Sequence, residues 1–151
     1  MHIKIHKSQH LLELWGADKL LHRFPIGVGK STDGPKLKRN DMRTPEGEYH
    51  VIVKNPQSKY FLSIGLNYPN RTDAWRSFKK GIITAETCQR ICSAHEHNQR
   101  IPWDTDMGGE IYIHGHLEER DWSEGCIRLY QDDIEALYNA INLDTPVSIQ
   151  P

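Results

Sequence analysis

Alternating apolar and polar residues fill the first 26 positions and predict a series of short β-hairpins. Isoleucines alternate with polar residues from Ile3 to Ile5, leucines do so at Leu12 and Leu14, and a third apolar stretch covers residues 21–26. A two-residue period is typical of strands that bury one face. Serine, glycine and aspartate between the stretches favour turns. We therefore expect three consecutive strands joined by tight connections.

This alternation is lost between residues 27 and 47 and returns afterwards. Residues 27–47 are rich in glycine, proline, lysine and aspartate, with few apolar side chains. Loops of that length inside a small domain are usually functional or disordered, and we expect an ordered functional loop. Alternation resumes over residues 49–53, and residues 60–64 form a further predicted strand.

The middle of the chain changes to a helical period. Thr72 and Asp73 indicate a helix start, and Gly81 indicates a break. Thr84 is a second N-cap, and the helix after it reaches about His95. The pattern predicts two helices inserted between strands.

The last third returns to short strands around one more helix. Residues 111–114 and 126–130 are predicted strands, and residues 147–149 form a closing strand. Asp132 and Asp133 lie in the first turn of a predicted helix with an apolar stripe. Acidic side chains in the first turn stabilise a helix by their interaction with its dipole. The whole pattern indicates a mainly β, mixed α/β fold, a sandwich or barrel with helical insertions.

Length, composition and charge narrow the class of protein. A chain of 151 residues is the size of one domain, and we expect residues 1–151 to form a single domain that is a monomer. The formal net charge is −1, and the basic cluster of Lys36, Lys38 and Arg39 is expected to be a solvated loop, which argues against nucleic acid as partner. No apolar run approaches the length of a membrane span.

The N-terminal residues carry no secretory signal. Residues 1–5 alternate instead of forming a charged region followed by an apolar one. Three explanations stay open: a signal already removed, another route of delivery, or a cytoplasmic location.

The chain has three cysteines, so at least one thiol is expected to be free. Cys88 and Cys92 lie four apart on a predicted helix, side by side, which is a poor geometry for a disulfide. Their face of the helix is expected to pack into the core. Cys126 lies in a different setting and is the candidate free thiol.

The Gly125-Cys126 pair is the strongest candidate for chemistry. Glycine permits a sharp turn in which consecutive N–H groups point at one spot, so the N–H groups of Gly125 and Cys126 could hold the oxyanion formed when the thiol attacks a carbonyl. If a strand follows, Arg128 lies on the same side as Cys126. There its charge could lower the pKa of the thiol or bind a substrate carboxylate.

A cysteine nucleophile needs a base, and His114 is the candidate. It ends the predicted strand 111–114, directly before Gly115, which frees the backbone to leave the strand. Alternation places His114 opposite Ile111 and Ile113, away from the core. A base within hydrogen-bond reach of the thiol is what activation requires.

Two metal sites are alternatives to the catalytic interpretation. His114, His116 and Cys126 could bind zinc, and the predicted helix offers a second cluster of Cys88, Cys92, His95 and His97. Neither has the paired C-x-x-C or H-E-x-x-H spacing that makes a metal site specific. We expect no metal and no cofactor.

Several motifs together resemble the YkuD-type L,D-transpeptidases. The family signature is a histidine, a loop and then Ser/Thr-His-Gly-Cys, and it is similar to the residues His114, Gly115, Ser123, Gly125, Cys126 and Arg128. Residues 44–49 are similar to the recurrent Thr-Pro-x-Gly-x-aromatic motif of the family. Residues 60–69, 103–109 and 121–123 are similar to its YafK-like subgroup, and the similarity covers nearly the whole chain.

The resemblance implies a reaction and a role for each matching residue. In this family a cysteine attacks the peptide bond between a diamino acid and the terminal D-alanine of a peptidoglycan tetrapeptide stem, and an amine or water then takes the acyl group. Cys126 would be the nucleophile and His114 the base, with the carbonyl of Gly115 orienting the imidazole. The substrate-binding residues would be Arg128, Ser123, Tyr68 and Trp103. The resemblance implies peptidoglycan stems as partner and the periplasm or cell envelope as location.

This chain departs from the family pattern at two places. Glu124 stands where a histidine often precedes Gly-Cys, which makes the local field less favourable to a thiolate. The stretch between His114 and Cys126 is shorter than usual and contains His116, Glu118 and Glu119. A short lid predicts a groove more open to water, so an L,D-carboxypeptidase or murein-trimming hydrolase is the alternative to a transpeptidase.

Overall fold

A mixed sheet of eight strands forms the body of the protein and curls around the core. The structure, a computed structural model, describes residues 1–117 and 122–151. The strand order is β3-β2-β1-β10-β5-β6-β7-β9, and β4 pairs with β8 in a separate two-stranded sheet. The strands are β1 (His2–His6), β2 (Leu11–Gly16), β3 (Lys19–Pro25), β4 (Val28–Gly29), β5 (Gly47–Ser58), β6 (Phe61–Leu66), β7 (Tyr112–His114), β8 (Trp122–Ser123), β9 (Ile127–Arg128) and β10 (Pro146–Gln150). This confirms the mainly β fold with helical insertions.

The predicted N-terminal hairpins are present. β1 and β2 pair antiparallel with Ile3 opposite Leu14 and Ile5 opposite Leu12, and β2 pairs antiparallel with β3. All four side chains are buried in the core. Alternation along the chain therefore placed the buried face of these strands correctly.

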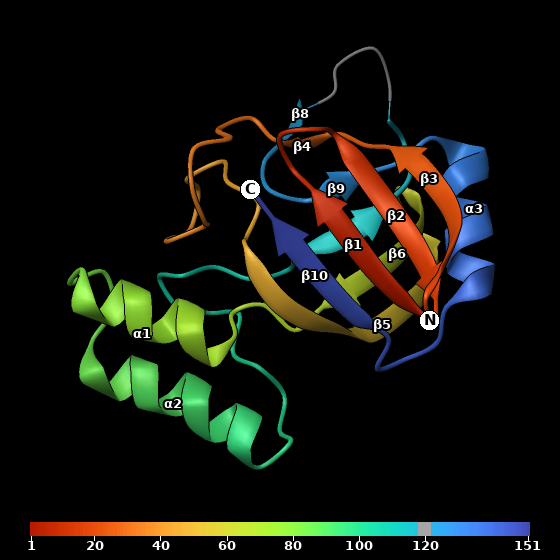
Figure 1. The fold of residues 1–151 in the computed structure, drawn as a ribbon. Helices are drawn as coiled ribbons and strands as arrows, with labels where there is room; N and C mark the ends of the chain where they lie inside the picture. The colour runs from red at the N-terminus through yellow and green to blue at the C-terminus, as the bar shows by residue number, and fades with distance from the viewer. Residues whose placement is uncertain (118–121) are drawn as a thin grey trace.

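The last strand, β10, joins the two halves of the sheet. It lies parallel to β1, with Ile149 opposite Ile5, and antiparallel to β5, with Val147 opposite Tyr49. Figure 1 shows β10 between β1 and β5. The N-terminal hairpins and the strands β5, β6, β7 and β9 are thus parts of one sheet because of this single strand.

The strands around the predicted thiol are shorter than the sequence indicates. The predicted strand 126–130 is reduced to Ile127–Arg128, because Cys126 belongs to the preceding turn and Tyr130 is already the N-cap of α3. The pair of β4 and β8 was not predicted, since two-residue strands show no alternation.

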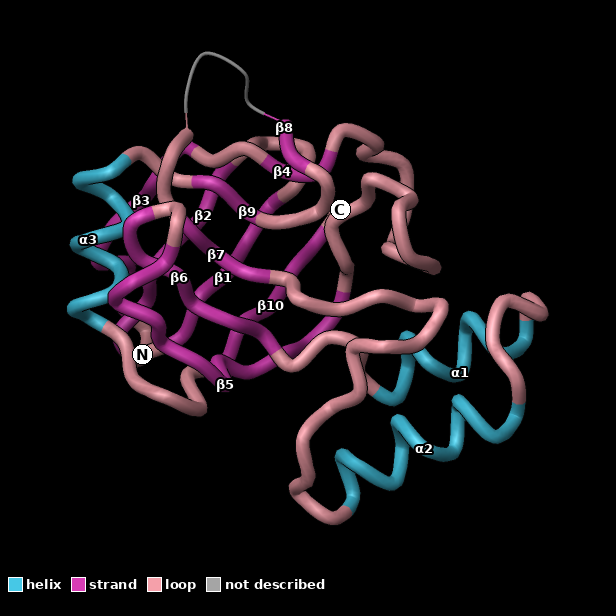
Figure 2. The backbone as a smooth tube through the Cα atoms, turned by 180° about the vertical axis from the view of Figure 1, so that it is seen from behind, coloured by secondary structure: helices cyan, strands magenta, loops and turns pink. Residues whose placement is uncertain are grey.

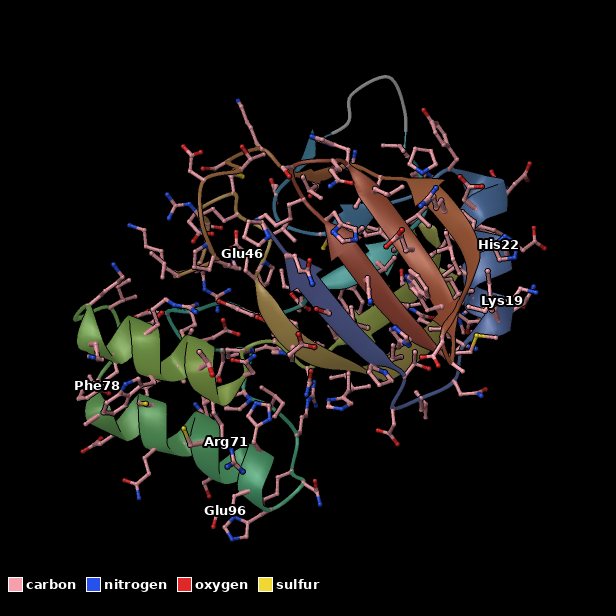
Figure 3. The ribbon with its side chains drawn as sticks, in the orientation of Figure 1. Lys19, His22, Glu46, Arg71, Phe78 and Glu96 are labelled. Atoms are coloured by element: carbon pink, nitrogen blue, oxygen red, sulfur yellow. The ribbon has the colours of Figure 1, made fainter. Side chains whose placement is uncertain are left out.

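Three helices accompany the sheet: α1 (Arg71–Lys79), α2 (Ala85–Glu96) and α3 (Gln131–Ala140). Asn70, and not Thr72, caps α1, in a capping box with Asp73; Thr84 caps α2 as predicted. Figures 1 and 2 show α1 and α2 side by side beyond one side of the sheet, while α3 lies at the other side and contacts β6. Phe78 marks the end of the helix pair that lies farthest from the sheet in Figure 3.

The long loop 27–47 is ordered by buried lysines. Lys7 is almost completely buried, and its ammonium donates to the carbonyls of Gly34 and Thr44 and to Glu46 at 2.8–3.0 Å. Figure 3 labels Glu46 where the loop meets β5. Lys36, which we expected in a solvated cluster, is also buried, because its ammonium pairs with Asp41 at 2.9 Å. In the described part of the chain, no helix is both long and apolar enough to cross a membrane.

Candidate active site

The turn before β9 carries Cys126 in a fixed position. The hydroxyl of Ser123 accepts the N–H of Gly125 at 3.0 Å and donates to the carbonyl of Cys126. Gly125 has φ +142°, and a Cβ there would lie 2.9 Å from the carbonyl oxygen of Arg43. Only glycine fits without a shift of the neighbouring backbone. The Ser123 hydroxyl thus holds the turn, and its expected contact with substrate stays a prediction.

Thr44 fastens this turn to the long loop. Its side chain is completely buried. Its hydroxyl accepts the N–H of Gly29 and donates to the carbonyl of Gly125, both at 2.8 Å. The threonine of the Thr-Pro-x-Gly motif therefore ties β4, the loop and the cysteine turn together. Sequence reasoning noted the motif and missed this role.

Cys126 is half-buried, and its sulfur takes part in two hydrogen bonds. The N–H of Tyr112 donates to it at 3.5 Å, and the thiol donates to the carbonyl of Glu110 at 3.5 Å. Burial raises the pKa of the Cys126 thiol above its ordinary value, although the Tyr112 N–H and the charge of Arg128 act in the opposite direction. Arg128 thus has the expected sign of effect, but desolvation outweighs it. The resting thiol is protonated at neutral pH.

Arg128 lies beside the thiol with an unused donor. It follows Cys126 by two residues, as the alternation of β9 predicts, and pairs in register with His114 on β7. Its Nε atom is buried and has no hydrogen-bond partner among residues 1–117 and 122–151. A buried guanidinium nitrogen without a partner is costly, and a carboxylate would satisfy it in the bidentate geometry that arginine favours.

His114 is buried, and its tautomer is fixed. Nδ1 bonds the carbonyl of Gly115 at 2.7 Å; since a carbonyl only accepts, Nδ1 carries the proton and Nε2 keeps a lone pair. The ring of Tyr60 stacks on the imidazole with centroids 4.2 Å apart. We expected His114 to point away from the core; it does lie opposite Ile113, but Tyr60 covers it. Burial lowers the pKa of His114 to about 4.

The two candidate catalytic residues lie on neighbouring segments: His114 ends β7, and Cys126 directly precedes β9. β7 and β9 are parallel, as Figure 2 shows side by side. No hydrogen bond joins His114 to Cys126 within the described ranges: the sulfur bonds Tyr112 and Glu110, and the imidazole bonds Gly115. The arrangement is a neutral thiol and a neutral imidazole rather than an ion pair.

The two aromatic candidates differ in exposure. Tyr68 is completely buried, and its hydroxyl donates to the carbonyl of Met107 at 3.0 Å, so its side chain supports the site from within the core. Trp103 is half-buried, donates from Nε1 to the carbonyl of Tyr68 at 3.0 Å and meets Tyr112 edge-on at 5.9 Å. Trp103 and Tyr112 together line a groove of about 1030 Å³.

The histidines and cysteines are spread over several environments. Cys88, Cys92 and Cys126 are all free thiols, and Cys88 packs in the core as expected. His116 is exposed and meets the edge of Tyr60. Among residues 1–117 and 122–151, no three histidine, cysteine or acidic side chains gather in a geometry for a metal ion. Glu118 and Glu119 lie outside the described residues.

The covered imidazole leads to a prediction about pH. A base must be neutral to accept a proton, and His114 stays neutral until the pH falls to about 4. We expect kcat/KM for a reaction that uses this base to persist from pH 7 to pH 5 and to fall about tenfold per unit below pH 4, whereas an ordinary histidine would lose function below about pH 6.5. Tyr60→Ala exposes the imidazole, so the pKa of His114 should rise. The pH below which kcat/KM falls (the acid limb of the pH profile) should then move to a higher value.

A matched control for Tyr60 is available on α3. Tyr138 is also half-buried and also has a lysine ammonium over its ring, that of Lys54 at 4.3 Å. Tyr138→Ala should leave the acid limb in place. An acid limb near pH 6.5 in the unaltered protein would contradict the assignment of His114 as the base.

Comparison with known proteins gives consistent matches. The sequence profile of the YkuD L,D-transpeptidase catalytic domain matches residues 1–149. A protein of Escherichia coli strain K12 named "Putative L,D-transpeptidase YafK" is 29% identical over 108 residues, which are 67% of this chain and 44% of that protein. The chain thus spans less than half the length of this curated relative.

Solved structures resemble the fold at low sequence identity. The helical cell shape determining protein Pgp2 from Campylobacter jejuni superposes with a TM-score of 0.63 at 19% identity, over 98% of this chain and 46% of that one. Bd1075 from Bdellovibrio bacteriovorus superposes with a TM-score of 0.60 at 24% identity, over 99% of this chain and 47% of that one. An L,D-transpeptidase from Xylanimonas cellulosilytica superposes with a TM-score of 0.59 at 12% identity, over 98% of this chain and 59% of that one. At these identities the likeness concerns the fold.

Proposed function

The chain belongs to the family of YkuD L,D-transpeptidase catalytic domains, and from this premise we propose that it is a peptidoglycan L,D-acyltransferase whose nucleophile is Cys126. The substrate is the tetrapeptide stem of peptidoglycan, cut between the diamino acid and the terminal D-alanine. The observation that carries the proposal is the turn of Gly125 and Cys126, fastened by Thr44 and Ser123, directly before the strand that pairs with β7 and its His114. The implied place of action is the cell envelope.

Acylation follows from the protonation states of the two side chains. The thiol gives its proton to Nε2 of His114 while the sulfur attacks the carbonyl carbon of the diamino acid, so the imidazole becomes charged only as the tetrahedral intermediate forms. Before the attack, the thiol must break its hydrogen bond to the carbonyl of Glu110. His114 then passes the proton to the departing nitrogen of D-alanine, which completes a thioester on Cys126. Water or an amine resolves the thioester by the reverse path.

The oxyanion is assigned to the backbone of the same turn. The N–H of Cys126 has no acceptor among the described residues and is the first donor. The N–H of Gly125 bonds the hydroxyl of Ser123 at 3.0 Å in the resting state, so it joins as second donor only when the hydroxyl yields. Arg128 is assigned to the carboxylate of the terminal D-alanine, which would satisfy its buried Nε.

Trapping the thioester tests the proposal. The purified protein is mixed with a tetrapeptide stem for seconds, quenched in acid and weighed by mass spectrometry. We expect a covalent adduct with the mass of the stem without its D-alanine, on the peptide that contains Cys126. An adduct on the peptide of Cys88 or Cys92 would contradict the assignment, as would D-alanine release without any adduct on Cys126.

The stable products identify the acceptor. Dimers or exchanged D-amino acids indicate transfer, and tripeptides alone indicate L,D-carboxypeptidase action. A zinc- or wall-binding module would bind stems or zinc without releasing D-alanine.

A further inference from the structure

A groove lies between the sheet and the segment that follows α2. The floor of this side groove includes Ile52, Val53 and Tyr112, and its wall is the segment 98–103 that follows α2. Its volume of about 1030 Å³ is at the upper end of ligand pockets. A single D-alanine would fill only a small part of it.

Tyr112 connects the side groove to the thiol, because it lines the groove and bonds the sulfur. Tyr112 and His114 are two residues apart on β7 and therefore point the same way. The N–H of Tyr112 donates to the sulfur of Cys126. Across the sheet, Tyr112 pairs with Gly65 and Gly65 with Val53, so the face continues from the nucleophile to β5.

Gly65 shapes the floor. A Cβ there would lie 3.0 Å from the ring of Tyr112 and 3.2 Å from Cβ of Val53. The missing side chain lets the Tyr112 ring lie down on the sheet. The space above it stays open between the ring and the wall.

One cation and one anion, Arg100 and Asp144, line the side groove. Arg100 is exposed on the wall, and neither its guanidinium nor the Tyr112 hydroxyl bonds a protein group in the described part of the chain. Burial and the negative charge of Glu110 raise the pKa of the Tyr112 hydroxyl, and the charge of Arg100 acts in the opposite direction. His50 adds a third polar group, and Asp144 supplies a negative charge to the lining.

We propose that the side groove binds the acyl-donor peptide stem and that Arg100 and the Tyr112 hydroxyl hold one of its carboxylates. The inference rests on the proposed function and adds the orientation of the bound peptide stem relative to the sulfur of Cys126. The stem lies over Tyr112 towards β5, and the terminal D-alanine lies on the other side of the sulfur, beside Arg128. Two arginines then hold carboxylates on either side of the bond that breaks, and Trp103 covers the stem between them.

Two pairs of variants test the side groove. Arg100→Gln removes the cation, and Arg90→Gln makes the same change of charge on α2, where the guanidinium is exposed and paired with Asp104 at 3.1 Å. Ile52→Glu places a carboxylate in the floor, and Leu21→Glu does so on β3; both native side chains are 37% exposed. We expect KM for D-alanine release to rise about tenfold in Arg100→Gln and in Ile52→Glu, with kcat within about twofold, and no change in either control.

Binding without turnover separates this inference from the proposed function. The same substitutions are placed in the Cys126→Ala protein, and the affinity for a tetrapeptide stem is measured by calorimetry. Weaker binding in Arg100→Gln and Ile52→Glu than in their controls supports the side groove, even if the unaltered protein releases no D-alanine. Equal affinities overturn it. It is also overturned if the variants slow only the transfer to an acceptor, since the side groove would then hold the acceptor stem.

Discussion

Cys126→Ala should reduce the release of D-alanine from tetrapeptide stems by more than about 10⁴-fold, because a methyl group cannot form the thioester. The substitution is small, and the turn is held by the hydroxyl groups of Ser123 and Thr44 rather than by the sulfur. We therefore expect the fold and the affinity for the stem to be kept while turnover is lost. D-alanine release, followed by a coupled assay, and the thermal midpoint measure the two effects separately.

A control for this loss is another free thiol. Cys92 is half-buried on α2, in a different part of the fold. Cys92→Ala should retain full activity, and alkylation of the Cys92→Ala protein should still inactivate it. If Cys126→Ala retains even a tenth of the activity, the nucleophile has been assigned wrongly.

Thr44→Val should lower kcat by about 100-fold or more and the free energy of unfolding by about 2–6 kcal/mol. Valine keeps the shape of threonine but leaves the N–H of Gly29 and the carbonyl of Gly125 buried without partners, each at a cost of about 1–3 kcal/mol. The Gly125 carbonyl belongs to the cysteine turn. Loss of its hydrogen bond to Thr44 should therefore also let the sulfur and the N–H of Cys126 move away from the positions that catalysis requires. Steady-state kinetics and urea unfolding measure the two effects.

Thr145 provides the matched control for Thr44. It is also buried, and its hydroxyl likewise accepts one backbone N–H and donates to one carbonyl, both belonging to Asn142. It lies in the connection between α3 and β10, outside the site. Thr145→Val should lower stability to a similar extent and leave kcat nearly unchanged. Equal losses of kcat in the two variants would show that Thr44 acts through stability alone.

The fold was predictable where a single strand or helix carries its own signal. The alternation of Ile3 and Ile5 placed β1, and Thr84 placed the start of α2. The start of α1 was misplaced because Asn70, the true cap, was less conspicuous than Thr72. The pairing of β4 with β8 depends on contacts between distant parts of the chain, which two residues cannot signal.

In the site, the sequence indicated the chemical groups but not their surroundings. The motifs pointed to Cys126, His114 and Arg128, and the structure pairs His114 with Arg128 in register on adjacent strands. The burial of His114 by Tyr60 could not be predicted, because that contact spans more than fifty residues and follows no local pattern. The same is true of Lys7 and Thr44, whose partners lie in other segments.

The central place of β10 has a consequence for the time course of biosynthesis. β10 is the last element described, yet it is the strand that pairs β1 with β5 through its two edges. A nascent chain on the ribosome can form the hairpins of each half, but it cannot close the sheet until β10 has emerged. Contacts between segments that are distant in the sequence also slow the folding step that forms them. The sheet therefore stays open until β10 is available, and disruption of β10 should yield two unjoined halves that proteases digest.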